Sequence, residues 1–484
     1  MTADTSASTG GHADRAPADG EVAGAQRLQR LQRRTVRVLV ASQVLGGIGV
    51  GSGVAVVGLL AYELSGTAAL SGVSATASTL GAAAAAIVIA RLSVARGRRP
   101  GLVTGYLVGG LGAAVAVVAA VLGVFWLHVV ASVAFGWASA SNLQARYAAT
   151  DLARPATRAR SLSTIVWATT FGAVLGPNLT GPGGSVAAVL SLPPLAGAYL
   201  FSFASFIGAA LVQLAWLRPD PLRTARELAA ASGAVAGGMP GGVPGGVAGG
   251  VPGGVPAAVP AVAAAGQGTV RVAIASIRSI PEATVAVLAI TAAHAVMVGI
   301  MVMTPVHMEH DGAALQLVGL TISLHIAGMY ALSPVMGALA DRLGRRNVVL
   351  FGLVQLVIAA VLAATGDPTG SVWFQGGLVL LGTGWSACLI AGSAWLTDVV
   401  PVAERPAVQG ASDLAMNLAG GVGGTLAGIV LAVAGYPALA LGAIVLLVPA
   451  AVGAWRLGRA GPRAGSRGRV GAWARLRPGV RSTP

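Results

Sequence analysis

Long apolar runs alternate with clusters of arginine along the chain, and this alternation limits what the chain can fold into. All 31 basic residues of the 484-residue sequence are arginines. Their main groups are Arg27 to Arg37, Arg91 to Arg99, Arg146 to Arg160, Arg218 to Arg278, Arg342 to Arg346, Arg405, and Arg456 to Arg481. Cytoplasmic loops of membrane proteins are rich in Lys and Arg. Positive charge that returns after every second apolar run therefore predicts an even number of spans, with both chain ends in the cytoplasm.

The overall composition indicates that lipid is the solvent of this chain. Hydrophobic residues make up 55% of it and charged residues only 10%, against about 25% charged in soluble domains. The net charge of +15 could suggest a nucleic-acid partner, but the sequence has no basic stripe interleaved with stacking aromatics. We interpret the arginines as topology determinants that also contact anionic lipid headgroups.

Twelve runs are long enough to cross a bilayer, which takes about 20 apolar residues. The predicted spans are 38–62, 69–90, 101–123, 125–145, 161–180, 194–217, 283–306, 314–338, 347–366, 371–396, 408–434 and 436–456. The runs are continuous rather than alternating, which favours helices over the strands of a membrane barrel. The predicted fold class is an all-α membrane protein with twelve transmembrane helices.

The chain divides into two similar halves. Gly97-Arg98-Arg99 recurs 247 residues later as Gly344-Arg345-Arg346, and Asp151 with Arg158 recurs at the same offset as Asp398 with Arg405. This spacing predicts two parallel six-helix repeats. Gly-Gly-Val-Pro repeats between them predict a flexible linker. The expected parts are a disordered cytoplasmic tail (1–35), the first half (36–217), the cytoplasmic linker (218–282), the second half (283–458) and a basic cytoplasmic tail (459–484).

One loop carries a family resemblance. Gly337-Ala-Leu-Ala-Asp341-Arg342-Leu-Gly344-Arg345-Arg346 lies between the eighth and ninth spans and is similar to the loop signature of the major facilitator superfamily. The first-half copy has Val94 where the family carries aspartate. The resemblance covers roughly residues 36 to 458. It implies a transporter that works by alternating access, with two halves rocking around a midplane cavity.

Two further motifs bear on the direction and coupling of transport. Gly172, Gly176, Pro177 and Gly181 in the fifth span resemble the signature of the family's antiporter branch. They are equally well interpreted as close helix packing without a bearing on direction. The arginine that the family places in the fourth span is absent, because Ser132 occupies its position. Its absence weakens any transfer of the family's usual proton-coupling step.

The loop motifs suggest a latch on the cytoplasmic side. We expect Asp341 to pair across the two halves near the start of the fifth span. Asp151 and Asp398 are expected to pair with arginines of their own half: Arg98 or Arg99, and Arg345 or Arg346. The complete candidate latch is Gly97, Arg98, Arg99, Asp151, Arg158, Gly337, Asp341, Arg342, Gly344, Arg345, Arg346, Asp398 and Arg405. Ordinary surface ion pairs, worth about 0–1 kcal/mol each, are the alternative interpretation.

Ionisable residues inside spans are costly in a membrane and are therefore functional candidates. Asp413 and Asn417 share one helical face of the eleventh span, so Asp413 is either a proton-binding carboxylate in the cavity or a headgroup-level partner of Arg405. His294 and His325 titrate near neutral pH when unperturbed, but packing is the more frequent role of a lone histidine. Gln43, Asn142, Gln144, Trp137, Trp167 and Trp385 are further candidates for lining the cavity.

These observations favour one function over several others. The chain has no lysine for a phosphate-binding Gly-rich loop, and Cys388 is its only cysteine, so neither ATP hydrolysis nor a cysteine metal cluster is expected. No cofactor is expected. The prediction is a non-enzymatic secondary transporter, acting as a monomer in a bacterial plasma membrane, that exports a small amphipathic or hydrophobic molecule in exchange for protons. An uncoupled facilitator or importer, or a receptor or scaffold on the same fold, remains the alternative.

Overall fold

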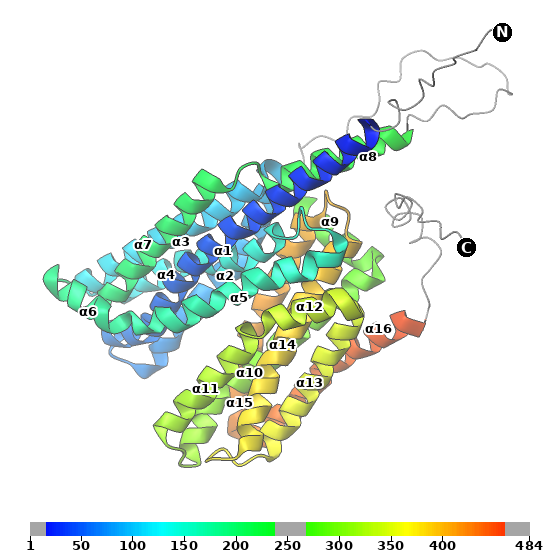
Figure 1. Cartoon of the computed structure of the whole chain (residues 1–484). Coiled ribbons are helices and arrows are strands. Elements are labelled where there is room, and N and C mark those ends of the chain that lie inside the picture. Colours follow the sequence, from blue (N-terminus) through cyan, green and yellow to red (C-terminus); the bar gives the residue numbers. More distant parts are fainter. Residues whose placement is uncertain (1–15, 238–267, 460–484) are drawn as a thin grey trace, which may run out of the picture.

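The computed structural model describes residues 16–237 and 268–459 of the chain (Figure 1), and these form a helical bundle in two halves. The first half consists of α1 (Ala16–Ser65), α2 (Ala68–Arg96), α3 (Arg98–Leu122), α4 (Phe125–Ala148), η1 (Pro155–Thr157), α5 (Arg158–Asn178), α6 (Thr180–Val189) and α7 (Ala196–Trp216). The second half consists of α10 (Pro281–His310), α11 (Leu315–Tyr330), α12 (Ser333–Leu343), α13 (Arg345–Thr365), α14 (Val372–Val399), α15 (Arg405–Ala443), η3 (Ile444–Leu447) and α16 (Val448–Arg459). Two further helices, α8 (Pro221–Gly237) and α9 (Gly268–Ser279), lie between the halves in sequence.

The described helices account for the twelve predicted spans. Nine stretches among the described residues are long and apolar enough to cross a membrane by length and hydropathy. One of these stretches, Arg405–Arg459, contains two successive helical segments, because Gly435 at φ 80° interrupts α15. It therefore accounts for the eleventh and twelfth predicted spans. The helices α4 and α5 have 24 and 21 residues. At about 1.5 Å per residue they too are long enough to cross the roughly 30 Å of hydrocarbon.

Several predicted boundaries differ from the structure. The helix α1 already begins at Ala16, inside the segment predicted to be a disordered tail. The predicted linker contains α8 and α9 at its two ends, and the part of the Gly-Gly-Val-Pro repeat beyond residue 237 lies outside the described residues, as does the basic tail after Arg459. The fifth span was predicted to end at residue 180, but α6 continues the helical path to Val189.

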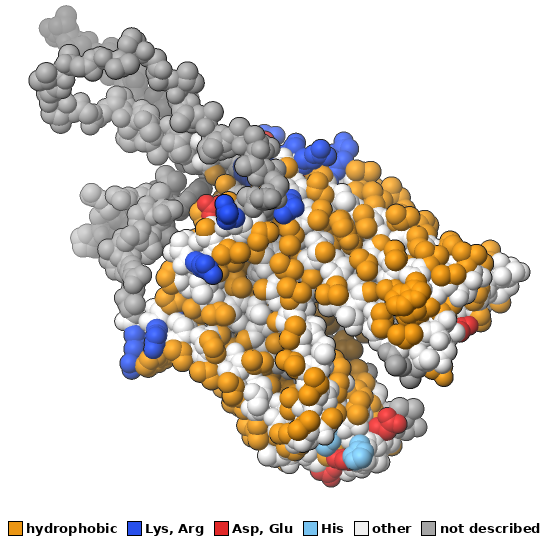
Figure 2. Space-filling view, turned by 180° about the vertical axis from the view of Figure 1, so that it is seen from behind, with side chains coloured by type: hydrophobic (Ala, Val, Ile, Leu, Met, Phe, Trp, Pro, Cys, Tyr) orange, Lys and Arg blue, Asp and Glu red, His pale blue; other side chains and the backbone are white. Residues whose placement is uncertain are grey.

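The two halves meet at one end of the bundle and separate at the other. We call the end where the arginine clusters lie the arginine face. In Figure 1 the halves lie together at this end and their opposite ends diverge, so that α6 and α11 are far apart. Figure 2 shows the resulting hollow between two lobes, which opens away from the arginine face. The helices α10 and α13 run away from the arginine face, so His307, near the end of α10, and Asp367, just after α13, lie at the opposite end.

Glycine allows the tight turns at the arginine face. Gly97 joins α2 to α3 at φ 94°, and Gly344 joins α12 to α13 at φ 91°. Residues with a side chain rarely adopt this region, so glycine is required at both turns. The two turns are equivalent positions of the 247-residue repeat, which indicates that the duplication extends to the backbone conformation of the motif.

Candidate functional site

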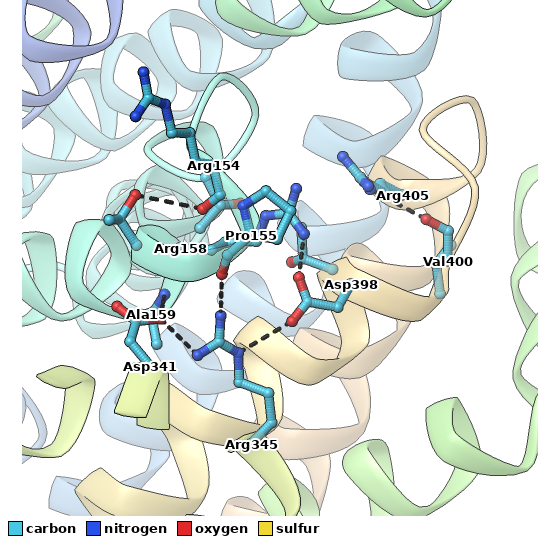
Figure 3. A network of polar contacts seen from close by, with 12 residues as sticks. Arg154, Pro155, Arg158, Ala159, Asp341, Arg345, Asp398, Val400 and Arg405 are labelled. Carbon is cyan, nitrogen blue, oxygen red and sulfur yellow. Dashed lines mark hydrogen bonds and ion pairs between the residues drawn. The ribbon is translucent and has the colours of Figure 1, made fainter. Parts of the chain in front are cut away.

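Asp341 crosses from the second half to the first at the arginine face. Its Oδ1 accepts a hydrogen bond from the backbone N–H of Ala159 at 3.1 Å, and its Oδ2 accepts one from Arg160 at 2.9 Å. These donors belong to the first turn of α5, where backbone N–H groups have no partner within the helix and the macrodipole favours negative charge. Figure 3 shows Asp341 directed at this helix end. The contact joins the two halves near the start of the fifth span.

Asp398 is the second acidic residue of this junction (Figure 3). Its Oδ2 accepts a hydrogen bond from Nε of Arg345 at 3.0 Å, and its Oδ1 pairs with Arg158 of the first half. Arg345 also bonds to Asp341 Oδ1 at 2.5 Å and to the backbone oxygen of Pro155 at 2.5 Å. Arg345 therefore holds Asp341 and Asp398 together within the second half and contacts the first half at Pro155. The contacts that cross the halves, from Asp341 to the first turn of α5, from Asp398 to Arg158 and from Arg345 to Pro155, have to break if this face opens.

The equivalent residues of the first half form a different network. Nε of Arg98 donates to Asp151 at 2.9 Å, which repeats the pair between Arg345 and Asp398, and both side chains are fully buried. Nη2 of Arg98 reaches across the halves to Oε1 of Gln409 in α15 at 2.5 Å. Arg405, the counterpart of Arg158, does not pair with Asp151 and instead donates from Nε to the backbone oxygen of Val400.

Three arginines of the predicted latch, Arg99, Arg342 and Arg346, form no ion pair with Asp151, Asp341 or Asp398. Nε of Arg346 donates to the backbone oxygen of Ala454. The backbone N–H of Arg99 donates to Asp220, and its buried Nε has no hydrogen-bond partner among the described residues. Arg342 is exposed. In each half it is therefore the first arginine of the Gly-Arg-Arg turn that pairs with the aspartate: Arg98 with Asp151, and Arg345 with Asp398.

Val94 in place of aspartate has a structural explanation. A carboxylate there would face the start of α15 as Asp341 faces the start of α5. The counterpart of Ala159 at the offset of 247 residues is Pro406, which has no backbone N–H to donate. Arg226 of α8 is bound here instead, donating to the backbone oxygens of Val94 at 2.8 Å and Ala403 at 3.4 Å. The helix that follows the sixth span therefore bridges the halves where the loop motif does not.

A cavity of about 240 Å³ lies between the halves, roughly midway along the spans. It is lined by Gln43, Val50, Ser139, Asn142, Leu143, Arg146, Ile165, Val166, Thr169, His294, Met329, Tyr330, Trp385, Leu389, Met416 and Asn417. These residues come from both halves, as expected for a cavity around which the halves move. Arg146 is the one arginine, lysine or acidic side chain among these lining residues.

Arg146 and Asp413 form a buried ion pair across the halves. Nη2 of Arg146 in α4 lies 2.5 Å from Oδ1 of Asp413 in α15, and the side chains are 2% and 1% exposed. Nη2 also donates to the hydroxyl of Tyr147, and Nη1 donates to the backbone oxygen of Leu143. The other carboxylate oxygen, Oδ2, is buried and makes no hydrogen bond within the described part of the chain. Losing one partner of such a pair is costly because it leaves an uncompensated charge.

This pair corrects two interpretations of the sequence. Arg146 was grouped with the loop arginines that follow it, but α4 continues to Ala148 and buries its side chain beside the cavity. The alternative partner for Asp413, Arg405, is wrong, because Arg405 bonds to Val400 at the arginine face. Arg146 lies on the same helix as Ser132, about four turns further along.

The remaining candidates separate into lining and packing residues. Gln43, His294, Trp385 and Asn417 line the cavity, as does Asn142. His294 Nδ1 accepts a hydrogen bond from the Trp385 indole at 3.0 Å. The structure does not place His325 at the cavity: it is 1% exposed, and its Nδ1 lies 2.9 Å from the backbone oxygen of Leu378. Gln144 is bound to the backbone of α2 through Ala86, and Trp137 and Trp167 are likewise absent from the lining.

The fifth-span glycines bring α5 against α1. A Cβ at Gly172 would lie 2.2 Å from backbone atoms of Gly47, and one at Gly176 would lie 2.5 Å from Gly51. Backbones this close leave no room for a side chain. Gly181 has no atom within 4 Å of such a Cβ, and Pro177 lies inside α5, one residue before its end. Two of the four motif residues therefore act in helix contact.

We expect Gly172→Ala to destabilise the protein by about 1–3 kcal/mol, because the added methyl forces α1 and α5 apart. Gly181→Ala, in the same motif but in open space, is the matched control and should leave the stability unchanged. Thermal unfolding of the purified variants in one detergent measures both. Equal unfolding temperatures for the two variants would contradict the close contact.

Comparison with known proteins identifies the family. The chain is 37% identical over 439 residues to the MFS-type transporter YdeG of Bacillus subtilis (strain 168), covering 90% of this chain and 95% of that protein. The chain belongs to the major facilitator superfamily. The family model described as Major Facilitator Superfamily matches residues 286–483. The predicted family and fold class are confirmed, and the chain is a membrane transporter of this superfamily rather than an enzyme.

Two other relatives of the superfamily show how far the similarity extends. The riboflavin transporter RfnT of Brucella anthropi is 25% identical over 385 residues, covering 79% of this chain and 85% of that protein. The human organic anion transporter MFSD10 superimposes with a TM-score of 0.63 over 87% of this chain and 99% of that one, at 18% identity. The second likeness bears on the fold alone, so the substrate has to be argued from the cavity.

Proposed function

We propose that this protein exports a small amphipathic molecule in exchange for protons, by alternating access. We take the arginine face as cytoplasmic, because positive charge resists translocation. The state described above is then open to the outside and closed to the cytoplasm by the contacts of Asp341, Asp398 and Arg98. We further propose that it acts as a monomer in the plasma membrane of a bacterium, with both chain ends in the cytoplasm.

The observation that carries the proposal is the ion pair between Arg146 and Asp413. It joins the two halves beside the cavity, and it exists only while Asp413 is ionised. A proton arriving through the outward opening neutralises Asp413 and weakens the pair, which lets the halves rock and open the arginine face. Substrate binding from the cytoplasm and release of the proton there restore the pair. One proton therefore moves inward in each cycle. The substrate is released outside when the protein returns to the outward-open state.

Two other features agree with this function. The cavity wall is largely apolar, with amides, aromatic rings and a compensated charge, which suits an amphipathic solute better than a phosphorylated one. The resemblance of the fifth span to the antiporter signature favours export. An uncoupled facilitator or importer would have the same cavity, but its transport would not depend on the ionisation of Asp413. A receptor or scaffold would show no solute-dependent proton movement.

The experiment uses inverted membrane vesicles that contain the protein and are acidified inside by respiration. A fluorescent pH indicator follows the lumen while a panel of lipophilic cations, neutral heteroaromatic compounds and lipophilic acids is added. We expect at least one compound to release protons from wild-type vesicles and none to do so with Asp413→Asn at equal expression. Asp367→Asn, which alters a fully exposed loop acid, should respond like the wild type. If Asp413→Asn vesicles released protons as the wild type does, the proton would have to bind at another residue. If no compound of the panel released protons from wild-type vesicles, coupled export of an amphipathic solute would be contradicted.

A further inference from the structure

The polar groups of the cavity identify a narrower class of substrate than amphipathic molecules in general. Its one charged wall residue, Arg146, is neutralised by Asp413 and also donates to the Leu143 and Tyr147 oxygens, while Nε of Arg146 and Oδ2 of Asp413 have no hydrogen-bond partner among the described residues. While Arg146 and Asp413 are paired, a charged substrate group that enters the cavity would lose its water without gaining a free counter-charge. Burying an unpaired charge costs far more than burying a paired polar group. In this state the wall therefore disfavours both cationic and anionic substrates.

Three carboxamides on the wall each have one end bound by the protein. Nε2 of Gln43 donates to Thr169 Oγ1 at 3.0 Å, and its Oε1 is buried without a hydrogen-bond partner among the described residues. Oδ1 of Asn142 accepts from the Tyr106 hydroxyl at 2.6 Å, which leaves its NH₂ group as a donor. Nδ2 of Asn417 donates to the backbone oxygen of Asp413 at 2.8 Å, which leaves its oxygen as an acceptor. These hydrogen bonds within the protein determine which end of each carboxamide, the oxygen or the NH₂ group, is available to a ligand.

The apolar part of the wall is built around two aromatic rings at a right angle. Trp385 and Tyr330 have ring centroids 5.8 Å apart and planes inclined by 85°. The Trp385 indole N–H is used by His294, so the ring is oriented and offers its hydrocarbon surface. Aromatic rings prefer such offset or edge-to-face partners. A flat ring placed on one of these rings meets the other edge-on.

Shape, charge and hydrogen bonding together point to one ligand chemistry. The cavity volume of about 240 Å³ lies below the roughly 300–1,000 Å³ of pockets for drug-sized ligands, which favours a small ligand in this state. We propose that the substrate is an uncharged planar heteroaromatic molecule of one or two fused rings, with hydrogen-bond donors and acceptors on its edge. Gln43, Asn142 and Asn417 bind that edge, and Trp385 and Tyr330 contact the ring. This inference rests on the proposed transport function and narrows its substrate.

A matched series of bicyclic compounds tests the inference on the purified full-length protein in lipid nanodiscs. The series is 2-quinolone (neutral, with a lactam N–H and C=O), naphthalene (neutral, without polar atoms), N-methylquinolinium (cationic) and quinoline-2-carboxylate (anionic). Binding is measured by isothermal titration calorimetry. We expect 2-quinolone to bind at least tenfold more tightly than each of the others, because a site built of amides rejects a ligand that leaves them unpaired. Equal affinity for naphthalene, or for either charged compound, would overturn the inference.

Substitutions test whether the named amides carry this preference. Gln43→Leu should lower the affinity for 2-quinolone towards that for naphthalene, because Asn142 and Asn417 keep part of the edge site. The affinity for naphthalene should not fall, which would show that the cavity is intact. Gln355 is the matched control, because its Nε2 also donates to a threonine hydroxyl, that of Thr383, but it does not line the cavity. Gln355→Leu should leave the series unchanged. Full 2-quinolone affinity in Gln43→Leu would overturn the assignment of the edge-binding site.

The failure of this inference can be distinguished from failure of the proposed function. Vesicles that release protons only in response to lipophilic cations, with no binding of 2-quinolone, would overturn the substrate class and leave proton-coupled export standing. Binding of 2-quinolone with the expected selectivity, in a protein that moves no protons, would support the substrate class and overturn the coupling.

Discussion

Arg146→Ala is expected to lower the free energy of unfolding by about 3–5 kcal/mol and to abolish proton-coupled transport. The physical reason is the environment of Asp413, which is 1% exposed and has Arg146 as its partner at 2.5 Å. Without the guanidinium the carboxylate is buried and uncompensated, or it takes up a proton permanently. Either outcome removes the charge change on which the proposed cycle depends. Thermal unfolding in detergent and the vesicle proton assay measure the two effects on the same variant.

The double variant Arg146→Leu with Asp413→Leu separates stability from coupling. Replacing a whole buried ion pair by apolar residues is often neutral or stabilising. We therefore expect the double variant to unfold close to the wild-type temperature while its proton response stays absent. If Arg146→Ala were as stable as the wild type and released protons normally, the pair would have neither of the proposed roles.

Asp341→Asn is expected to open the arginine face in a larger fraction of molecules. The neutral amide keeps the size of the side chain but loses the charge that faces the first turn of α5 and the guanidinium of Arg345. A contact made in only one of two states shifts the population by as much as its differential free energy. The distance between spin labels on the two halves at this face, introduced at Ala156 and Asn347, measures the shift. The exposed-loop variant Asp367→Asn should leave the distance distribution unchanged, and an unchanged distribution in Asp341→Asn would contradict the latch.

The fold could be predicted from the sequence because its determinants are local. Run length sets whether a helix crosses the bilayer, and arginine in the short loops sets the orientation. Gly97 and Gly344 were recognisable because the same turn recurs at one offset. The helix α8 was missed because it leads into a Gly-rich repeat that indicates a linker, and only its contacts, such as those of Arg226 with Val94 and Ala403, show a structural role.

The candidate site could be predicted only in part, because its partners are distant in sequence. Asp413 was recognisable as an acid inside a span, but its partner Arg146 lies 267 positions away and is followed closely by loop arginines. The cross-half bond from Arg98 to Gln409 spans 311 positions. Sequence shows that these residues are polar, but not which of them meet. The one available signal for Arg146 was its position on the helix that carries Asn142, one turn earlier on the same face.

The most direct test of the account is the distance across each face of the bundle as the pH changes. Two labelled pairs are made after replacing the buried Cys388 with alanine: Ala156 with Asn347 at the arginine face, and Thr67 with Ala314 at the opposite face. Double electron–electron resonance in nanodiscs measures both pairs at high and low pH. The account predicts that acidification lengthens the first distance and shortens the second, and that Asp413→Asn shows the low-pH distances at every pH. Distances that do not respond to pH, or that change in the same direction at both faces, would contradict alternating access controlled by the pair of Arg146 and Asp413.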